Sequence, residues 1–244
     1  MKIFGLIGRN IDYSFSVDYF SEKFKNRNDN DSVYKNFDIP DVCYFPQIIK
    51  KNKGLRGLNV TIPYKTDIIP YLKELSRKAE QIGAVNCIKI TKKGKLKGYN
   101  TDAYGFRKSL CPLLGLHHKR ALILGSGGAS KAVAFVFKEL GIEYRHVSRN
   151  PQVGEFSYSD ISKLIMDDFL IVVNCTPIGT FPNFDSSLDL NYNYFSNKHI
   201  AFDLVYNPSE TRFLQLAKAK GAVTKNGYEM LVFQAEKAWS IWNR

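Results

Sequence analysis

The sequence predicts a mixed α/β fold whose second half contains a parallel sheet. Apolar segments of strand character alternate with segments of helical periodicity along most of the chain. In addition, the continuous apolar run Arg120–Leu124 leads directly into a glycine loop and a helical segment, as expected of a strand that is buried on both faces. At 244 residues, the chain could form one large domain or two small ones.

The composition is that of a globular protein and argues against membrane helices, disulfides and a zinc site. Hydrophobic residues make up 44% and charged residues 24% of the chain, which is typical of globular proteins. No apolar run approaches the roughly 20 residues of a membrane helix, so we expect no membrane contact. The four cysteines are scattered without a close pair, which argues against a disulfide framework or a zinc site and fits a reducing cytoplasm. We therefore predict a cytoplasmic protein without a bound metal.

The net charge of +12 arises from 35 basic and 23 acidic residues. Its lysines are spread through the chain without one arginine-rich segment, so we do not expect a nucleic-acid partner. A positive field of this kind helps to attract acidic small molecules.

The first half of the chain contains a stretch that ends at a lysine. Leu58, Val60 and Ile62 alternate with polar residues, which predicts a strand over Leu55–Ile62. Pro63 should end this strand, so Lys65 would lie at a strand-to-helix corner, where a partly desolvated lysine can donate or accept a proton. Alone, the pattern favours an ordinary strand followed by a solvated lysine, and the motifs elsewhere in the chain favour the functional interpretation. Other elements expected in this half are strands at Lys2–Ile7, Tyr34–Ile39, Gly83–Ile90 and Leu96–Tyr99, and helices after a Ser14 or Ser16 cap, over Val42–Lys50, up to Ile82 and over Ala103–Leu114.

The glycine loop stands between a strand and a helix. Glycines permit a tight turn and let a pyrophosphate approach the amides at a helix N-terminus. The helix should stop at Gly141, before a strand over Ile142–Val147. A glycine loop alone is often only a turn, but this context predicts dinucleotide binding. The candidate loop residues are Gly125, Ser126, Gly127, Gly128 and Ala129.

About twenty residues beyond the loop, an NAD site would carry a carboxylate for the ribose. The sequence has Ser148-Arg149-Asn150 there instead. An arginine suits a 2′-phosphate, so Ser148 and Arg149 predict NADP in preference to NAD. The alternative is a surface arginine at a strand end.

Two further strands, Leu170–Asn174 and Ile200–Leu204, complete the predicted parallel sheet. Residues just past such strands, including Thr176 and Val205, line the ligand crevice of this fold. A helix is expected to begin with Asn207 as cap, Pro208 in the first position and Glu210 reaching back, and to end near Gly221. The last helix should cover Tyr228–Trp242.

Short motifs run in order from the first strand to the last helix. They are Ser14-x-Ser16, Asn59–Lys65, Gly83–Asn86, Asn100–Phe106, Gly125–Ala129, Asn174–Gly179, Asp203–Pro208 and Asn226–Ala235. With these motifs the chain resembles the shikimate dehydrogenase family over nearly its whole length. The resemblance implies reduction of 3-dehydroshikimate to shikimate with NADPH, by two α/β domains with a cleft between them. Residues 1–102 plus 228–244 would form the substrate-binding domain, and 103–227 the Rossmann-like nucleotide-binding domain.

The resemblance also implies roles for single residues. Lys65 and Asp102 would form the acid–base pair, and the sequence leaves open which of them exchanges the proton. Ser14 and Ser16 would bind the substrate carboxylate. The ring hydroxyls would be bound by Thr61, Asn86, Tyr206 and Gln234, and Gly227 would join the nucleotide site. Taken singly, the serines and Asp102 could be helix caps only.

Alternatives remain within and outside this activity. A quinate/shikimate dehydrogenase paralogue using NAD is opposed by the serine pair and by Arg149. A non-catalytic dinucleotide-binding regulatory protein is opposed by the presence of both Lys65 and Asp102. Around the serines, Asn10, Tyr13 and Val17 replace the proline, histidine and proline usual in the family. Either a monomer or a homodimer is compatible with the sequence.

Overall fold

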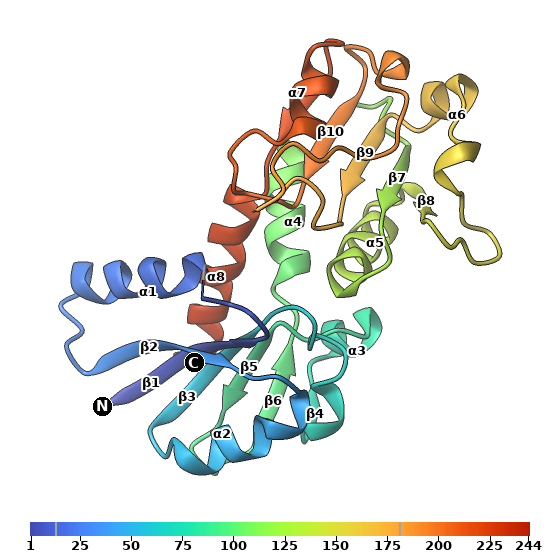
Figure 1. The fold of residues 1–244 in the computed structure, drawn as a ribbon. Coiled ribbons are helices and arrows are strands. Elements are labelled where there is room, and N and C mark those ends of the chain that lie inside the picture. Colours follow the sequence, from blue (N-terminus) through green and yellow to red (C-terminus); the bar gives the residue numbers. More distant parts are fainter. Residues whose placement is uncertain (13, 181) are drawn as a thin grey trace. The chain divides into compact units, whose positions relative to one another are not determined.

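The computed structural model describes residues 1–12, 14–180 and 182–244, so Tyr13 lies outside the described residues. The chain divides into two compact units. The first comprises Met1–Thr101 and Ala235–Arg244, and the second comprises Asp102–Gln234. Each unit contains one sheet flanked by helices, which confirms the predicted α/β class (Figure 1). Within the described ranges, the helices are too short or too polar to cross a bilayer.

The first unit is built on a six-stranded mixed sheet. Its strands are β1 (Lys2–Gly8), β2 (Ser32–Asp38), β3 (Leu55–Val60), β4 (Glu74–Leu75), β5 (Cys87–Ile90) and β6 (Leu96–Tyr99). They lie in the order β2-β1-β3-β5-β6-β4. Strand β1 pairs in parallel with β2 and β3, whereas β5 runs antiparallel to both β3 and β6. The carboxyl ends of β1 and β3 therefore lie next to the beginning of β5, on the same side of the sheet.

Helices cover both faces of this sheet. On one face lie α1 (Phe15–Asn26) and the end of α8 (Tyr228–Trp242), with Phe20 stacked on Tyr34 at 4.5 Å between ring centroids. On the other face, α2 (Phe45–Lys51) buries Phe45 against a second apolar cluster. The remaining helix of the unit is α3 (Arg77–Ile82). Because β3 is sandwiched in this way, even its polar Asn59 is only 5% exposed.

Three expectations about the first unit were wrong. The strand expected over Gly83–Ile90 begins only at Cys87, because Gly83 ends α3 with a φ of +68°. Strand β3 ends at Val60, and Ile62, expected to be its last apolar residue, is 66% exposed in a turn. The predicted helical region before Ile82 is interrupted by a 3-10 turn (Ile69–Tyr71) and by the edge strand β4. Hydrogen bonds to the distant strand β6 decide this, because Lys73 N donates to Leu96 O over 3.0 Å and no local pattern encodes that partner.

The second unit contains a five-stranded, fully parallel sheet. Its strands are β7 (Arg120–Leu124), β8 (Glu143–Val147), β9 (Ile171–Asn174), β10 (Ile200–Asp203) and β11 (Val223–Lys225), in the order β11-β10-β9-β7-β8. From β7 the chain passes first to β8 on one side and then to β9 on the other. The boundary between β7 and β9 is thus the switch point at which ligands bind in such sheets. The short β11 was not among the predicted strands.

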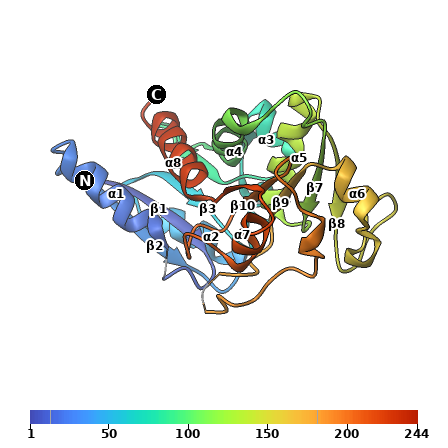
Figure 2. The same cartoon turned by 90° about the horizontal axis from the view of Figure 1, so that it is seen from above.

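Four helices pack on this sheet. They are α4 (Asp102–Leu110), α5 (Gly128–Leu140), α6 (Lys163–Asp168) and α7 (Arg212–Lys218). Helices α4 and α5 lie side by side (Figure 2), and Phe106 meets Phe137 and Phe202 edge-on at 5.6 and 5.1 Å. On the opposite face of the sheet, Met166 of α6 and Phe213 of α7 pack into a second apolar cluster. Helix α5 ends at Gly141, whose φ of +68° is the left-handed cap that the sequence predicted.

The predicted helix start at Asn207 was wrong. Helix α7 is capped by Thr211, whose hydroxyl accepts from Leu214 N over 3.4 Å. The same hydroxyl donates to the buried Asp203 over 2.6 Å, which fixes the start four residues later than expected. Glu210 does not reach back to a cap but pairs with Lys218 at 2.8 Å.

Candidate active site

The turn after β3 carries Thr61 and Lys65. Thr61 N donates to Ile7 O and Tyr64 N donates to Thr61 O, each over 2.9 Å, so the turn is fastened to β1 and closed on itself. Tyr64 is 3% exposed and its hydroxyl donates to Ile39 O over 2.7 Å. Lys65 is half-buried, and its carbonyl accepts from Val85 N over 2.7 Å. The lysine is therefore held by its backbone at the carboxyl end of β3.

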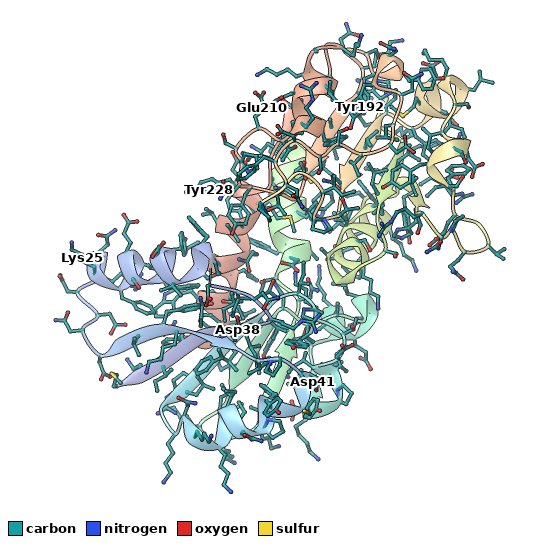
Figure 3. All side chains as sticks on the ribbon, in the orientation of Figure 1. Lys25, Asp38, Asp41, Tyr192, Glu210 and Tyr228 are labelled. Atoms are coloured by element: carbon teal, nitrogen blue, oxygen red, sulfur yellow. The ribbon has the colours of Figure 1, made fainter. Side chains whose placement is uncertain are left out.

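The two serines lie at the start of α1. Ser14 is the N-cap, and its Oγ accepts from Ser16 N over 3.2 Å, as predicted for a cap. Both side chains are half-buried. Asp38 lies at the end of β2 (Figure 3). Its carboxylate holds the preceding loop, because it accepts from the amides of Asn10 and Ile11, each over 3.0 Å. This carboxylate fixes the loop in which Asn10 replaces the family's proline.

A buried chain of hydrogen bonds leads from Tyr34 through Asn59 to Asn86. The Tyr34 hydroxyl donates to Asn59 Oδ1 over 2.8 Å, and the nearby Ser16 side chain acts to lower the pKa of Tyr34. Asn59 Nδ2 in turn donates to Asn86 O over 3.3 Å. Burial raises the pKa of Tyr34 well above its usual value, so its hydroxyl keeps its proton. Sequence reasoning missed Tyr34, for which the one available signal was an asparagine inside a strand with apolar neighbours.

The side chain of Asn86 also holds Thr101, the residue that precedes Asp102. Its Nδ2 donates to Thr101 Oγ1 over 2.9 Å, and its Oδ1 accepts from Thr101 N over 2.6 Å. Asp102 follows directly as the first residue of α4 and is 5% exposed. An acidic residue in the first turn of a helix is favoured by the helix dipole. The candidate substrate residue Asn86 is thus also a structural anchor for the segment that carries Asp102.

The glycine loop joins β7 to α5. Gly125 has a φ of +102°, and a Cβ there would lie 2.9 Å from Thr176 Cγ2. Gly127 is the N-cap of α5, and a Cβ there would meet open space. Ser130 is buried and donates its hydroxyl to Gly127 O over 2.6 Å, so it fills the place of the third small residue without reaching the ligand side. The free amides and dipole of this long helix fit a pyrophosphate.

Arg149 follows β8 and is exposed. Ser148 Oγ accepts from Asn150 N over 3.2 Å, which shapes the turn that presents the arginine. Burial raises the pKa of the nearby Tyr158, and the charge of Arg149 acts in the opposite direction. Because β8 is the outer neighbour of β7, Arg149 follows the strand next to the one that carries the glycine loop.

The other candidate nucleotide residues gather beyond β9 and β10. Thr176 N and Oγ1 donate to Asn174 Oδ1 over 2.9 and 2.7 Å. Gly227 N donates to Val205 O over 3.0 Å, and a Cβ on Gly227 would collide with Leu204 O. The structure therefore brings Thr176, Val205 and Gly227 to neighbouring loops.

Two substrate candidates also belong to the second unit. Tyr206 is half-buried beside Val205. Gln234 lies on α8, is 9% exposed and donates from Nε2 to Leu231 O over 2.9 Å. Among the described residues, no group of three or more histidine, cysteine or carboxylate side chains is arranged to hold a metal ion.

Comparison with known proteins decides the family. Residues 6–88 match the family model of the shikimate dehydrogenase substrate binding domain. A shikimate dehydrogenase (NADP(+)) of Clostridium botulinum is 37% identical over 249 residues, which cover 98% of this chain and 95% of the relative. The chain belongs to the shikimate dehydrogenase family. This membership confirms the resemblance seen in the sequence.

Solved structures of the family have the same fold. Shikimate 5-dehydrogenase from Thermus thermophilus, in complex with NADP(H) and shikimate, has a TM-score of 0.87 at 31% identity and covers 99% of this chain and 93% of its own. Quinate dehydrogenase from Corynebacterium glutamicum, in complex with NAD, has a TM-score of 0.87 at 26% identity with the same two coverages of 99% and 93%. The fold is therefore shared by members that differ in substrate and cofactor.

Proposed function

We propose that this chain catalyses the reversible NADPH-dependent reduction of 3-dehydroshikimate to shikimate, in the biosynthesis of aromatic amino acids. The observation that carries the proposal is the family match over nearly the full length, together with a lysine anchored at the end of β3 and a glycine loop at the switch point of the second sheet. All four cysteines are free thiols, which supports a cytoplasmic location.

In this proposal the first unit is the main binder of the substrate. The hydroxyls of Ser14 and Ser16 at the start of α1 receive the substrate carboxylate. Thr61 and Asn86, at the end of β3 and the beginning of β5, bind ring hydroxyls, with Tyr206 and Gln234 as further partners. The substrate-binding domain comprises residues 1–102 plus 228–244, and the nucleotide-binding domain comprises 103–227.

The residues of the second unit fit a dinucleotide, because the space beside Gly127 is open and α5 begins there. When bound, NADPH supplies the hydride that reduces the substrate carbonyl carbon. The pyrophosphate binds the loop of Gly125, Ser126, Gly127, Gly128 and Ala129. Ser148 and Arg149 hold the 2′-phosphate, whereas Thr176, Val205 and Gly227 lie on the nicotinamide side.

Lys65 donates the proton in the reduction and accepts it in the reverse reaction. As the carbonyl carbon is reduced, the carbonyl oxygen gains negative charge, and the Lys65 ammonium donates a proton to it, which leaves a neutral amine that solvent reprotonates. In the direction of shikimate oxidation, the neutral amine accepts the hydroxyl proton. Asp102 is proposed as the carboxylate that stabilises the ammonium form.

An assay of nicotinamide reduction tests the proposal directly. Purified protein is mixed with shikimate or quinate and with NADP⁺ or NAD⁺, and the absorbance of the reduced cofactor is followed. Turnover with shikimate and NADP⁺ far above the other three combinations is expected. Comparable turnover with quinate and NAD⁺ would instead place the chain with the quinate dehydrogenases, and no turnover in any mixture, from folded protein that binds nucleotide, would contradict an enzymatic role.

A further inference from the structure

The last residues of β9 and β10 form a buried polar pair. Asn174 and Asp203 are partners in the strand register, and both are fully buried. Asn174 Nδ2 donates to Asp203 Oδ1 over 2.9 Å. The two residues are distant in sequence, so only the parallel pairing of β9 with β10 brings them together.

Each member of the pair holds one of the loops at the switch point. Asn174 Oδ1 accepts both the amide and the hydroxyl of Thr176. Asp203 Oδ1 accepts the amide of Val205 over 3.0 Å, and Val205 O accepts from Gly227 N. The side-chain contact between Asn174 and Asp203 therefore connects the three candidate residues of the nicotinamide side.

Hydrogen-bonding chemistry explains why these two residue types are needed. The asparagine must turn its oxygen to the two donors of Thr176, so its NH₂ group faces β10 and requires an acceptor there. A carboxylate supplies an acceptor that can take the Asn174 and Val205 donors on one oxygen and the Thr211 hydroxyl on the other. Because buried polar groups are costly when unpaired, a change in one loop propagates to the other.

From this arrangement, and resting on the NADP-binding function proposed above, we infer that Asn174 and Asp203 are positioning residues that set the two loops for the nicotinamide half of the cofactor. Neither side chain is assigned a contact with the cofactor. The adenosine half would bind at the glycine loop and Arg149, whereas the side chains of the pair are hydrogen-bonded to Thr176, Val205 and Thr211. The pair should therefore affect the two halves of the cofactor unequally.

Two ligands separate the halves experimentally. NADP⁺ uses both halves of the site, whereas adenosine 2′,5′-bisphosphate carries the adenosine and the 2′-phosphate but no nicotinamide. Calorimetric titration of full-length protein gives the ratio of the two affinities. In Asn174→Ala, we expect the affinity for NADP⁺ to fall about tenfold or more, because Thr176 loses both of its bonds to Asn174, with the affinity for the bisphosphate changed less than about twofold.

A second variant guards against a failure of Asn174→Ala to fold. Asp203→Asn preserves the shape of the side chain and an acceptor oxygen but removes the charge that strengthens its bonds. The same selective loss is expected at about threefold, since a neutral acceptor holds the Val205 amide less firmly. The Km for NADP⁺ should rise in step while the bisphosphate still binds normally.

Thr211→Val is the matched control. It removes a donor to the same buried carboxylate and the cap of α7, so it should lower the free energy of unfolding, but it leaves the bonds from Asn174 and Val205 in place. Its affinity ratio should match the wild type. Three results would overturn the inference: equal losses of affinity for both ligands, an unchanged affinity ratio in folded variants, or the same shift of the ratio in Thr211→Val. In each case, binding of both ligands by the wild-type protein would still uphold the proposed function. Wild-type protein that binds neither ligand would overturn both.

Discussion

The hydroxyl of Tyr34 on β2 donates to Oδ1 of Asn59 on β3, although β1 lies between these two strands. Tyr34 is 4% exposed, and its ring stacks on Phe20 of α1. Because its ring packs on α1 and its hydroxyl holds Asn59, the tyrosine connects the first helix with the strand that leads to Lys65. One side chain thus relates the proposed carboxylate site to the proposed proton donor.

Tyr34→Phe tests this connection. The ring stack is retained, but Asn59 Oδ1 loses a buried donor, so we expect the free energy of unfolding to fall by about 1–3 kcal/mol. The Km for shikimate should rise more than kcat falls, because the loss affects binding groups. Chemical denaturation and steady-state kinetics measure both effects. Tyr44→Phe is the control, since Tyr44 is 43% exposed, and equal effects of the two variants would contradict the argument.

Lys65→Met tests the role of the lysine. We expect kcat to fall by about 10² or more while shikimate affinity changes less, because a proton donor acts mainly in the transition state. Single-turnover kinetics and equilibrium binding separate the two quantities. The control Lys73→Met removes an exposed lysine from the segment that follows the same turn. Near-normal turnover in the Lys65 variant would show that another group exchanges the proton.

Arg149→Ala tests the choice of cofactor. Loss of the guanidinium should lower the affinity for NADPH by about tenfold or more and the affinity for NADH much less, because only NADPH carries the 2′-phosphate. Fluorescence titration with both cofactors provides the comparison. Arg145→Ala, on the preceding strand β8 and paired with Glu143 at 3.5 Å, should affect the binding of neither cofactor. A loss of equal size for NADPH and NADH would remove the argument from the 2′-phosphate.

Asp203 should make stability depend on pH. Burial raises its pKa from 3.8 to about 6, whereas its hydrogen-bond donors act in the opposite direction. A raised folded-state pKa means that the folded protein binds the proton more tightly than the unfolded chain. The contribution of this group to stability is therefore complete below about pH 4 and is lost as the pH rises through about 6, by up to about 3 kcal/mol.

The measurement compares wild type with Asp203→Asn, which cannot ionise there. Urea unfolding between pH 4 and pH 7.5 should show the wild type losing stability relative to the variant as the pH rises. Other titrating groups cancel in this difference. A difference that stays constant, or that changes in the opposite direction, would show that the carboxyl is not held protonated by burial.

The sequence predicted those parts of the fold that local patterns encode. The apolar run of β7, the glycine loop and the left-handed stop at Gly141 each specify their own backbone, so the second sheet and α5 were anticipated closely. The candidate residues Ser14, Lys65 and Arg149 could be named from motifs because each belongs to a short segment of fixed type. Local chemistry was sufficient there, since turns, caps and buried strands depend on neighbouring residues.

The tertiary structure decided what depends on distant partners. Thr211, and not Asn207, begins α7 because its hydroxyl finds Asp203. Tyr34 gains its place in the site from Asn59, and Asn174 gains its acceptor only when β9 and β10 pair in register. A sequence pattern records which side chains are polar, but the partner of a buried polar group is set by strand order and register, which arise only when the sheets assemble.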